Sequence, residues 1–264
     1  KTMCTQENGI RIPIKPQGTF AIEVKNINRP FTLSWLIVED TKLPIVLSPG
    51  DSIHIELDYW AVLNSARFTG KSAGNSTYYL QYYLKFKQTD RYENILNTDT
   101  HYLDQIKRYR SDEDSLLQTA LDSRIIDSAY FTFESDRIRY EYGDKVLYKR
   151  YATPNHDVGI TQEIGNMMKN IDLKDSIALC NYSEYRSLIT RYIDYLVAQD
   201  LGVYSESKGF PKRMALAERL LYPGVNYSYY GYAQCKSVYD NARNDTQEEV
   251  YNHLINTYRD PELT

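Results

Sequence analysis

The sequence predicts an α+β protein: an antiparallel β-sheet or sandwich domain at the amino-terminal end, followed by an all-helical domain. Short segments within residues 1–70 alternate apolar and polar side chains with a period of two, as half-buried strands do. From residue 71 on, apolar side chains recur with the three- and four-residue spacing of helices. The segment Gly70–Gly74 (GKSAG) separates the two patterns and is interpreted as a hinge. We therefore expect two domains, at residues 1–70 and 71–264.

Composition and charge are those of a folded chain and exclude several classes of function. Of the 264 residues, 42% are hydrophobic and 25% are charged, which is typical of a globular protein. The net charge is −4 and no basic patch appears, so we expect no binding to nucleic acid. No run of about 18 or more apolar residues is present, so we expect no transmembrane segment. The 26 tyrosines indicate helices packed in thin layers, with ring edges that reach solvent.

The strands are predicted from short alternating segments. These are Phe20–Lys25, Phe31–Val38, Leu43–Leu47, Ile53–Asp58 and Ala66–Thr69. Pro49 and Gly50 suit the central positions of a type II turn, because proline presets φ at the first and glycine accepts a positive φ at the second. We therefore expect the two strands that flank Ser48–Asp51 to pair as an antiparallel hairpin.

The helices are predicted from apolar spacing and from capping residues. They are expected at 79–86, 101–109, 113–122, 124–142 (closed by Pro154), 158–169, 182–199 and 212–221, and after a capping box at Thr246–Glu249. For the 182–199 helix, Asn181 is the expected N-cap and Glu184 its partner in a capping box. The acidic run Asp112–Asp114 is interpreted as the amino-terminal end of a helix.

No catalytic, cofactor-binding or metal-binding residue is predicted. The sequence holds no nucleophile elbow, no H-E-x-x-H zinc motif and no complete phosphate-binding loop. The four histidines are not spaced as metal ligands and are interpreted as surface residues; they are His54, His101, His156 and His253. We therefore expect no cofactor and no enzymatic activity from this chain.

The three cysteines are Cys4, Cys180 and Cys235, and no C-x-x-C motif is present. The sequence therefore predicts neither a redox dithiol nor a common zinc knuckle. Cys180 and Cys235 are expected either to form a disulfide in an oxidising compartment or to remain two buried free thiols.

An aromatic stretch, Asn226–Ala233 (NYSYYGYA), is predicted to be a loop. If the protein binds a glycan or a peptide, we expect binding here, since exposed aromatic rings concentrate binding energy. The alternative is an ordered connection packed on neighbouring helices.

The order of several segments resembles the non-catalytic amino-terminal region of TlpA-like thiol–disulfide oxidoreductases of the Bacteroidetes. These segments are LPIVLSPGDSIHIELD (43–58), an F-x-G pattern at Phe68–Gly70, a Tyr-rich helix start at Asn75–Tyr83, and the turn NIDLKD (170–175) before a Tyr- and Leu-rich helix that reaches Leu196. The resemblance covers about residues 18–200, and it is carried by the order of the segments rather than by any single one.

The resemblance implies a β-domain and a helical region that accompany a thioredoxin-like domain. That domain and its C-x-x-C are not in this sequence, so no redox residue of the family can be assigned here. Either the chain stops before such a domain, or the protein never had one. The strands that the family's β-domain has before Gly18 are also missing.

The function we expect from this resemblance is that of a non-catalytic cell-envelope module. It would lie in the periplasm or be attached to the outer membrane, with a signal sequence that is not in this chain. Its partner would be a thioredoxin-fold domain or that domain's protein client, which it would position, dimerise or bind; a homodimer would serve the same role. The alternative is a stand-alone protein that binds a glycan or a peptide through exposed tyrosines.

Overall fold

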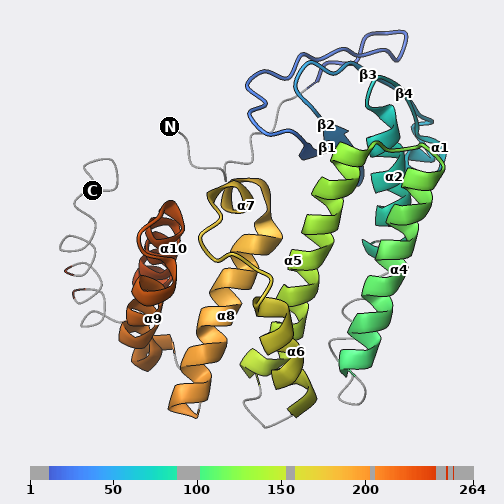
Figure 1. Ribbon diagram of the computed structural model, residues 1–264. Coiled ribbons are helices and arrows are strands. Elements are labelled where there is room, and N and C mark those ends of the chain that lie inside the picture. The colour runs from blue at the N-terminus through green and yellow to red at the C-terminus, as the bar shows by residue number, and fades with distance from the viewer. Residues whose placement is uncertain are drawn as a thin grey trace. The chain divides into compact units, whose positions relative to one another are not determined.

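The α+β class is confirmed: small antiparallel sheets come first and a mainly helical region follows (Figure 1). The computed structural model describes residues 12–87, 102–152, 158–202 and 206–241, together with Glu248 and Asn252. The chain divides into two compact units. Unit 1 comprises residues 1–92 and 115–134, and unit 2 comprises residues 93–114 and 135–264.

Unit 1 contains two antiparallel sheets of two strands each. β1 (Thr32–Val38) pairs with β2 (Thr41–Leu47), and β3 (Ile53–Glu56) pairs with β4 (Arg67–Gly70). The turn between β1 and β2 is Glu39–Asp40, and Glu39 adopts a left-handed φ of 52°. Positive φ is what the tight turns of hairpins require, because their twist then matches that of the strands.

The predicted hairpin around Ser48–Asp51 is wrong in its pairing, although the turn itself forms. The Asp51 N–H donates to the Ser48 carbonyl at 3.2 Å, and Gly50 has a φ of 74°. The strand before this turn pairs instead with β1, because the two-residue turn at Glu39–Asp40 closes a shorter loop. The strand predicted at Phe20–Lys25 is also wrong, since the segment has no regular secondary structure and no ladder partner among the described residues.

The helices of unit 1 follow the strands. They are α1 (Val62–Ser65), α2 (Ala73–Tyr82) and the π-helical turn η1 (Tyr83–Lys87). The expected hinge at Gly70–Gly74 is not a loop, because β4 ends at Gly70 and α2 begins at Ala73. A Cβ added to Gly74 would come within 1.7 Å of the Ile125 carbonyl oxygen. Glycine is therefore required here by a close backbone approach.

Helix α2 closes the outer edge of β2. The Ser76 hydroxyl accepts a hydrogen bond from the Val46 N–H at 3.0 Å and lies 3.3 Å from the Val46 carbonyl, to which it can donate. Leu43 of β2, Leu80 of α2 and Val62 of α1 form one buried cluster. Sheet and helix thus hold each other through both backbone and side-chain contacts.

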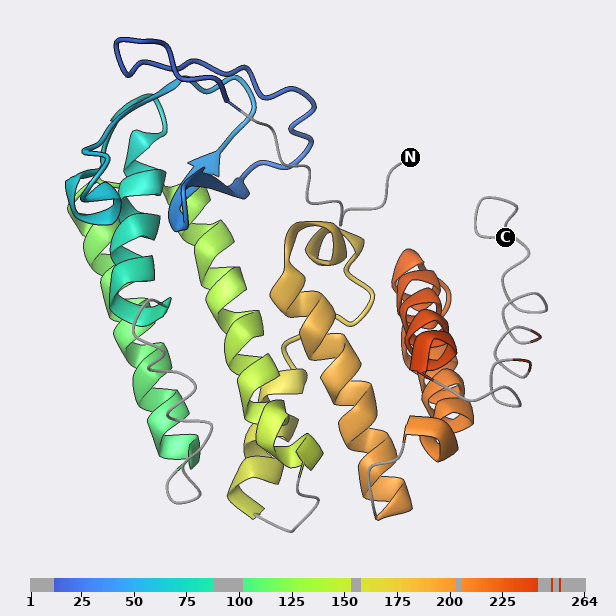
Figure 2. The same cartoon turned by 180° about the vertical axis from the view of Figure 1, so that it is seen from behind.

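The helical region begins with α4 (Tyr102–Asp122) and α5 (Ser128–Ala152), each of which belongs partly to both units. It continues with α6 (Val158–Met168), α7 (Ser176–Asn181), α8 (Ser183–Leu201), α9 (Glu206–Leu221) and α10 (Val225–Asn241). Helix α9 packs against α8 and α10 (Figure 2). Among the described residues, no helix combines the length and the apolar character needed to cross a membrane.

Several predicted helix boundaries need correction. The patterns at 101–109 and 113–122 form one continuous helix, α4, so Asp112–Asp114 lies inside a helix and not at its start. There Asp114 pairs with Arg110, one turn earlier, at 3.5 Å. Helix α5 begins at Ser128 rather than at residue 124 and runs on to Ala152. Pro154 and the two residues of the second predicted capping box, Thr246 and Glu249, lie outside the described residues.

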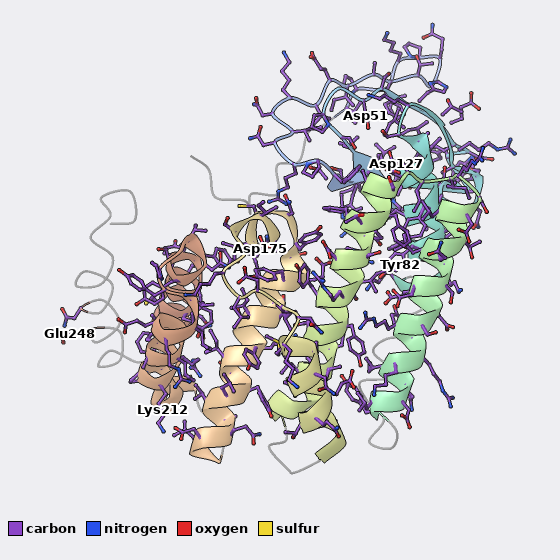
Figure 3. The ribbon with its side chains drawn as sticks, in the orientation of Figure 1. Asp51, Tyr82, Asp127, Asp175, Lys212 and Glu248 are labelled. Carbon is purple, nitrogen blue, oxygen red and sulfur yellow. The ribbon has the colours of Figure 1, made fainter. Side chains whose placement is uncertain are left out.

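The predicted capping box of the 182–199 helix is also wrong. Asn181 is the last residue of α7, and the N-cap position of α8 is held by Tyr182, whose side chain makes no capping bond. The capping carboxylate is that of Asp175, at the amino end of α7 (Figure 3). It accepts hydrogen bonds from the N–H groups of Ile177 and Ala178 at 2.8 and 2.9 Å.

Replacing Gly74 with alanine should destabilise unit 1 by about 1–3 kcal/mol, because the added methyl meets a backbone carbonyl that cannot swing aside. Both tryptophans, Trp35 and Trp60, lie in unit 1, so urea unfolding followed by tryptophan fluorescence reports on this unit. The control is Gly165→Ala in α6, where the added methyl meets nothing within 4 Å. An unchanged fluorescence midpoint for Gly74→Ala would contradict the close approach.

Candidate functional site

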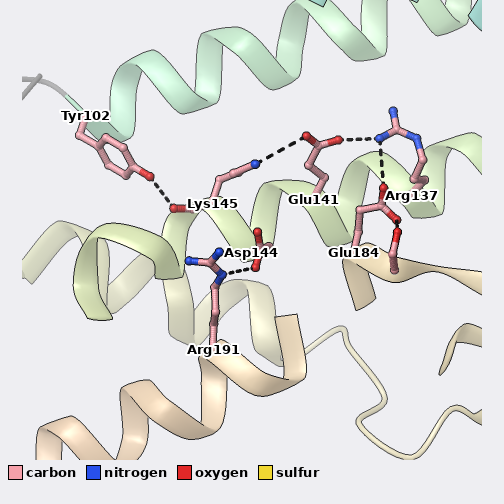
Figure 4. A network of polar contacts seen from close by, with 8 residues as sticks. Tyr102, Arg137, Glu141, Asp144, Lys145, Glu184 and Arg191 are labelled. Atoms are coloured by element: carbon pink, nitrogen blue, oxygen red, sulfur yellow. Dashed lines mark hydrogen bonds and ion pairs between the residues drawn. The ribbon is translucent and has the colours of Figure 1, made fainter. Parts of the chain in front are cut away.

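A group of buried charges on α5 is the first candidate site (Figure 4). Arg137, Glu141 and Asp144 are separated by four and three residues, so they lie along one side of the helix. Their exposed fractions are 5%, 5% and 7%. Buried charges are strongly destabilising unless they are paired, so their partners decide what this group can do.

Arg137 and Glu141 are the centre of a network that joins three helices of unit 2. The Nη1 of Arg137 lies 2.5 Å from Oε2 of Glu141 and 3.7 Å from Oε1 of Glu184 on α8. The Nζ of Lys145 lies 3.9 Å from the second carboxylate oxygen of Glu141. Tyr102 of α4 donates its hydroxyl proton to the Lys145 carbonyl at 2.5 Å. The network therefore links α4, α5 and α8.

Asp144 makes a second link between α5 and α8. Its Oδ1 lies 2.5 Å from Nε of Arg191, and the Arg191 guanidinium carbon lies 4.5 Å from the centroid of the Tyr148 ring. Burial raises the pKa of the Asp144 carboxyl, and the positive charge of Arg191 opposes that rise. The carboxylate thus depends on Arg191 for its charge balance.

The chemistry of this network favours a structural role. Glu141 and Asp144 each face a cation, whereas a general acid or base needs a group that is poised to exchange a proton with a substrate. Among the described residues, no three or more His, Cys, Asp or Glu side chains gather as a metal site. We interpret the network as one that sets the alignment of the helices.

The second candidate site is the Trp60 loop, which we define as Asp58–Ala61 in unit 1. The Trp60 side chain is 88% exposed, although tryptophan is among the largest apolar side chains. The Tyr59 ring, 43% exposed, packs edge-on against the Trp60 ring with centroids 5.0 Å apart. The loop therefore presents two adjacent aromatic rings to solvent.

Hydrogen bonds fix the backbone of the Trp60 loop. The Trp60 N–H donates to Oδ1 of Asp58 at 2.9 Å, and the Asp58 N–H donates to Oγ of Ser65 at 2.8 Å. The Ser65 hydroxyl in turn donates to the Ala61 carbonyl at 2.8 Å, and Tyr59 donates its hydroxyl proton to Glu39. Because the loop is already ordered, a partner that buries Trp60 would pay little conformational entropy.

The sequence analysis did not identify Trp60, although a local signal was present. Asp58 is typical of the first residue of a turn in which the Asp side chain accepts the N–H of residue i+2, here that of Trp60. The alternation of Ile53–Asp58 predicted a strand that reaches Asp58. In the structure β3 ends at Glu56, and Asp58 belongs to the turn.

The aromatic stretch Asn226–Ala233 is not a loop, which contradicts the prediction. It forms the first half of α10, and both Asn226 and Tyr230 are only 1% exposed. The Asn226 amide donates to the Leu173 carbonyl at 2.8 Å and to the Tyr185 hydroxyl at 3.1 Å. Of the two expected alternatives, packing on neighbouring segments is therefore the one that the structure supports.

The remaining predicted residues do not assemble into a site. His54 is exposed and lies 3.3 Å from Glu56, whereas the other three histidines are outside the described residues. Cys180 and Cys235 form no disulfide, but Cys180 is exposed, so the expectation of two buried thiols is confirmed for Cys235 and wrong for Cys180. Burial raises the pKa of the Cys235 thiol to about 11. Cys4 is outside the described residues.

Comparison of the chain with protein-family models, with curated proteins and with solved structures found no match. The likeness to TlpA-like proteins therefore rests on the order of the sequence segments alone.

Removing Arg137 should destabilise the protein by about 3–5 kcal/mol, because Arg137→Met leaves the Glu141 carboxylate buried without its nearest cation. The measurement is the free energy of unfolding in urea, followed by far-UV circular dichroism. Lys212→Met is the matched control, since Lys212 pairs with Asp200 at the surface and its loss should cost less than about 1 kcal/mol. Equal losses for the two variants would refute the structural role of the network.

Cys235 should resist alkylation in the folded protein. With a pKa of about 11, only about a thousandth of this thiol is thiolate at pH 8, and the side chain is buried as well. Treatment with N-ethylmaleimide at pH 8, followed by peptide mass mapping, should modify Cys180 first and Cys235 only after urea is added. Rapid native labelling of Cys235 would show that α10 packs differently.

Proposed function

We propose that this chain is a non-catalytic module of the cell envelope that binds either a thioredoxin-like redox domain or that domain's protein client. The observation that carries the proposal is the Trp60 loop, an ordered loop that holds an 88% exposed tryptophan in place. The link to redox proteins and to the envelope comes from the sequence resemblance described above.

An exposed and ordered tryptophan suits a protein that acts by contact. Tryptophan is enriched among the residues that dominate binding energy at interfaces, where truncation to alanine costs about 2 kcal/mol or more. Hydrogen bonds to the side chains of Asp58 and Ser65 already hold the loop before a partner binds. Client polypeptides that are not yet folded expose apolar side chains, which can pack against the Tyr59 and Trp60 rings.

The test uses two probes: a thioredoxin-fold protein encoded in the same genome, and a reduced, carboxymethylated α-lactalbumin as a permanently unfolded client. Biolayer interferometry with the whole chain should detect binding to at least one of them. The Trp60→Ala variant should bind that probe about 30-fold more weakly, which corresponds to the loss of about 2 kcal/mol.

Ile177→Ala is the control for this test. Ile177 is 71% exposed on α7 in unit 2, so its truncation removes exposed apolar surface that is not part of the Trp60 loop and should leave binding unchanged. The proposal fails if neither probe binds, or if Trp60→Ala binds as tightly as the unmodified chain.

A further inference from the structure

The edge of β1 that faces away from β2 offers a second contact surface, and the Val46–Ser76 contact shows how it is oriented. Val46 directs its N–H and its carbonyl toward Ser76 of α2, which means that both point away from β1. Val46 lies opposite Leu33. Val46 and Leu33 therefore form a non-hydrogen-bonded pair of the antiparallel ladder, in which both residues turn their N–H and C=O groups away from each other. Such pairs recur at every second residue. Leu33, Trp35 and Ile37 therefore present their backbone groups to the side of β1 that faces away from β2.

Pro44 agrees with this assignment. It lies opposite Trp35, in the same class of pair as Val46 and Leu33. A proline has no N–H to donate, so it is tolerated in a strand only where that group is not required by the ladder. The hydrogen-bonded pairs of the sheet are thus the alternate ones, such as Ser34 with Ile45.

We call these outward backbone groups, with the side chains of Leu33, Trp35 and Ile37, the β1 edge. The three side chains are 41%, 41% and 60% exposed. In the described part of the chain, β1 has β2 as its one ladder neighbour. None of the seven residues of β1 (TLSWLIV) is charged or a proline, which are the residues that usually protect exposed strand edges.

We propose that the β1 edge pairs with the β1 edge of a second copy of this chain, antiparallel about a two-fold axis at Trp35. Leu33 then lies opposite Ile37 of the second copy, and Trp35 opposite Trp35. All three residues present outward backbone groups in this register, so each can both donate and accept a hydrogen bond across the axis. The result is one continuous sheet in the order β2–β1–β1–β2.

The exposed side chains of β1 also fit a second copy. Opposite residues of an antiparallel pair place their side chains on the same face, so the exposed apolar row of one copy joins that of the other. An edge that complements itself in this way is what a two-fold dimer requires.

The alternative occupants of the β1 edge are the chain's own segment Phe20–Lys25 and a foreign strand. Phe20–Lys25 is extended in part, since Glu23 and Lys25 lie 3.6 Å apart on one side of it. The chain runs from Phe20–Lys25 to β1 through Phe31. The Phe31 ring centroid lies 5.1 Å from that of Tyr130 and 5.2 Å from that of Phe133, so this connection is held against α5. Either occupant would leave the chain monomeric, which separates both from the proposal.

The experiment is analytical ultracentrifugation of the whole chain at about 100 µM, where an association with a low-micromolar dissociation constant is nearly complete. The molar mass measured for the unmodified chain should be twice the 30.9 kDa of a single chain. Leu33→Glu and Ile37→Lys should each weaken the dimer about a thousandfold and leave the chain mainly monomeric at this concentration, because each two-fold dimer of a variant buries two unpaired charges. Ile177→Lys in unit 2, at a 71% exposed side chain, should leave it intact.

Mixing the two variants tests the register. A Leu33→Glu chain and an Ile37→Lys chain place opposite charges directly across the axis from each other, so their equimolar mixture should recover a dimer that neither forms alone. Circular dichroism checks that each variant is folded; if one is not, the exchanged pair Leu33→Lys and Ile37→Glu tests the same contact.

A monomeric unmodified chain, a dimer that survives Ile37→Lys, or a mixture that stays monomeric would each overturn the proposal. The inference goes beyond the proposed function and does not depend on it. Trp60→Ala should weaken probe binding and leave the dimer intact, so the two proposals can fail separately.

Discussion

The contact between Ser76 and Val46 is the constraint on which the arrangement of unit 1 depends. By taking both backbone groups of Val46, one hydroxyl of α2 occupies the outer edge of β2 and fixes which side of the sheet is closed. The opposite side, along β1, is left with apolar side chains and outward backbone groups. The same contact brings α2 against the sheet, and this positions Leu80 over Leu43. The contact surface that we infer on β1 is thus a consequence of how the other edge was closed.

In unit 2, polar contacts decide which helix faces lie together. An apolar side chain in a helical bundle can slide by a turn and still be buried, whereas the Arg137 guanidinium satisfies Glu141 and Glu184 in only one alignment of α5 and α8. The Asp144–Arg191 pair repeats that requirement about two turns along α5. Such pairs contribute little net stability compared with apolar packing, but removing one member is strongly destabilising. Gly143, between Glu141 and Asp144, adds a steric condition, because a Cβ there would lie 2.7 Å from the sulfur of Met167 and 2.8 Å from Leu188.

Local sequence signals predicted the elements of the fold better than their partners. The turn at Ser48–Asp51 follows from Pro49 and Gly50, yet the strand before it pairs upstream, because the competing turn at Glu39–Asp40 has no proline or glycine to reveal it. Asn181 is of a residue type that favours the N-cap position, but in the structure it is the last residue of α7. The aromatic stretch at 226–233 reads as exposed until Asn226 is seen to be bonded to Leu173 and Tyr185, which are far away in the sequence. The exposure of Trp60 likewise depends on which distant segments pack near it, and no local sequence pattern carries that information.

The π-helical turn η1 limits how the length of the chain can vary at the end of α2. The chain from Tyr83 to Lys87 follows the wider π turn, in which more residues are needed to complete one turn than in an α-helix. Phe86, which is fully buried 5.3 Å from the Tyr82 ring, lies in this turn, so deleting a residue between Tyr83 and Phe86 would displace its ring within the core. The length of the chain is therefore constrained here by the packing of a single aromatic side chain.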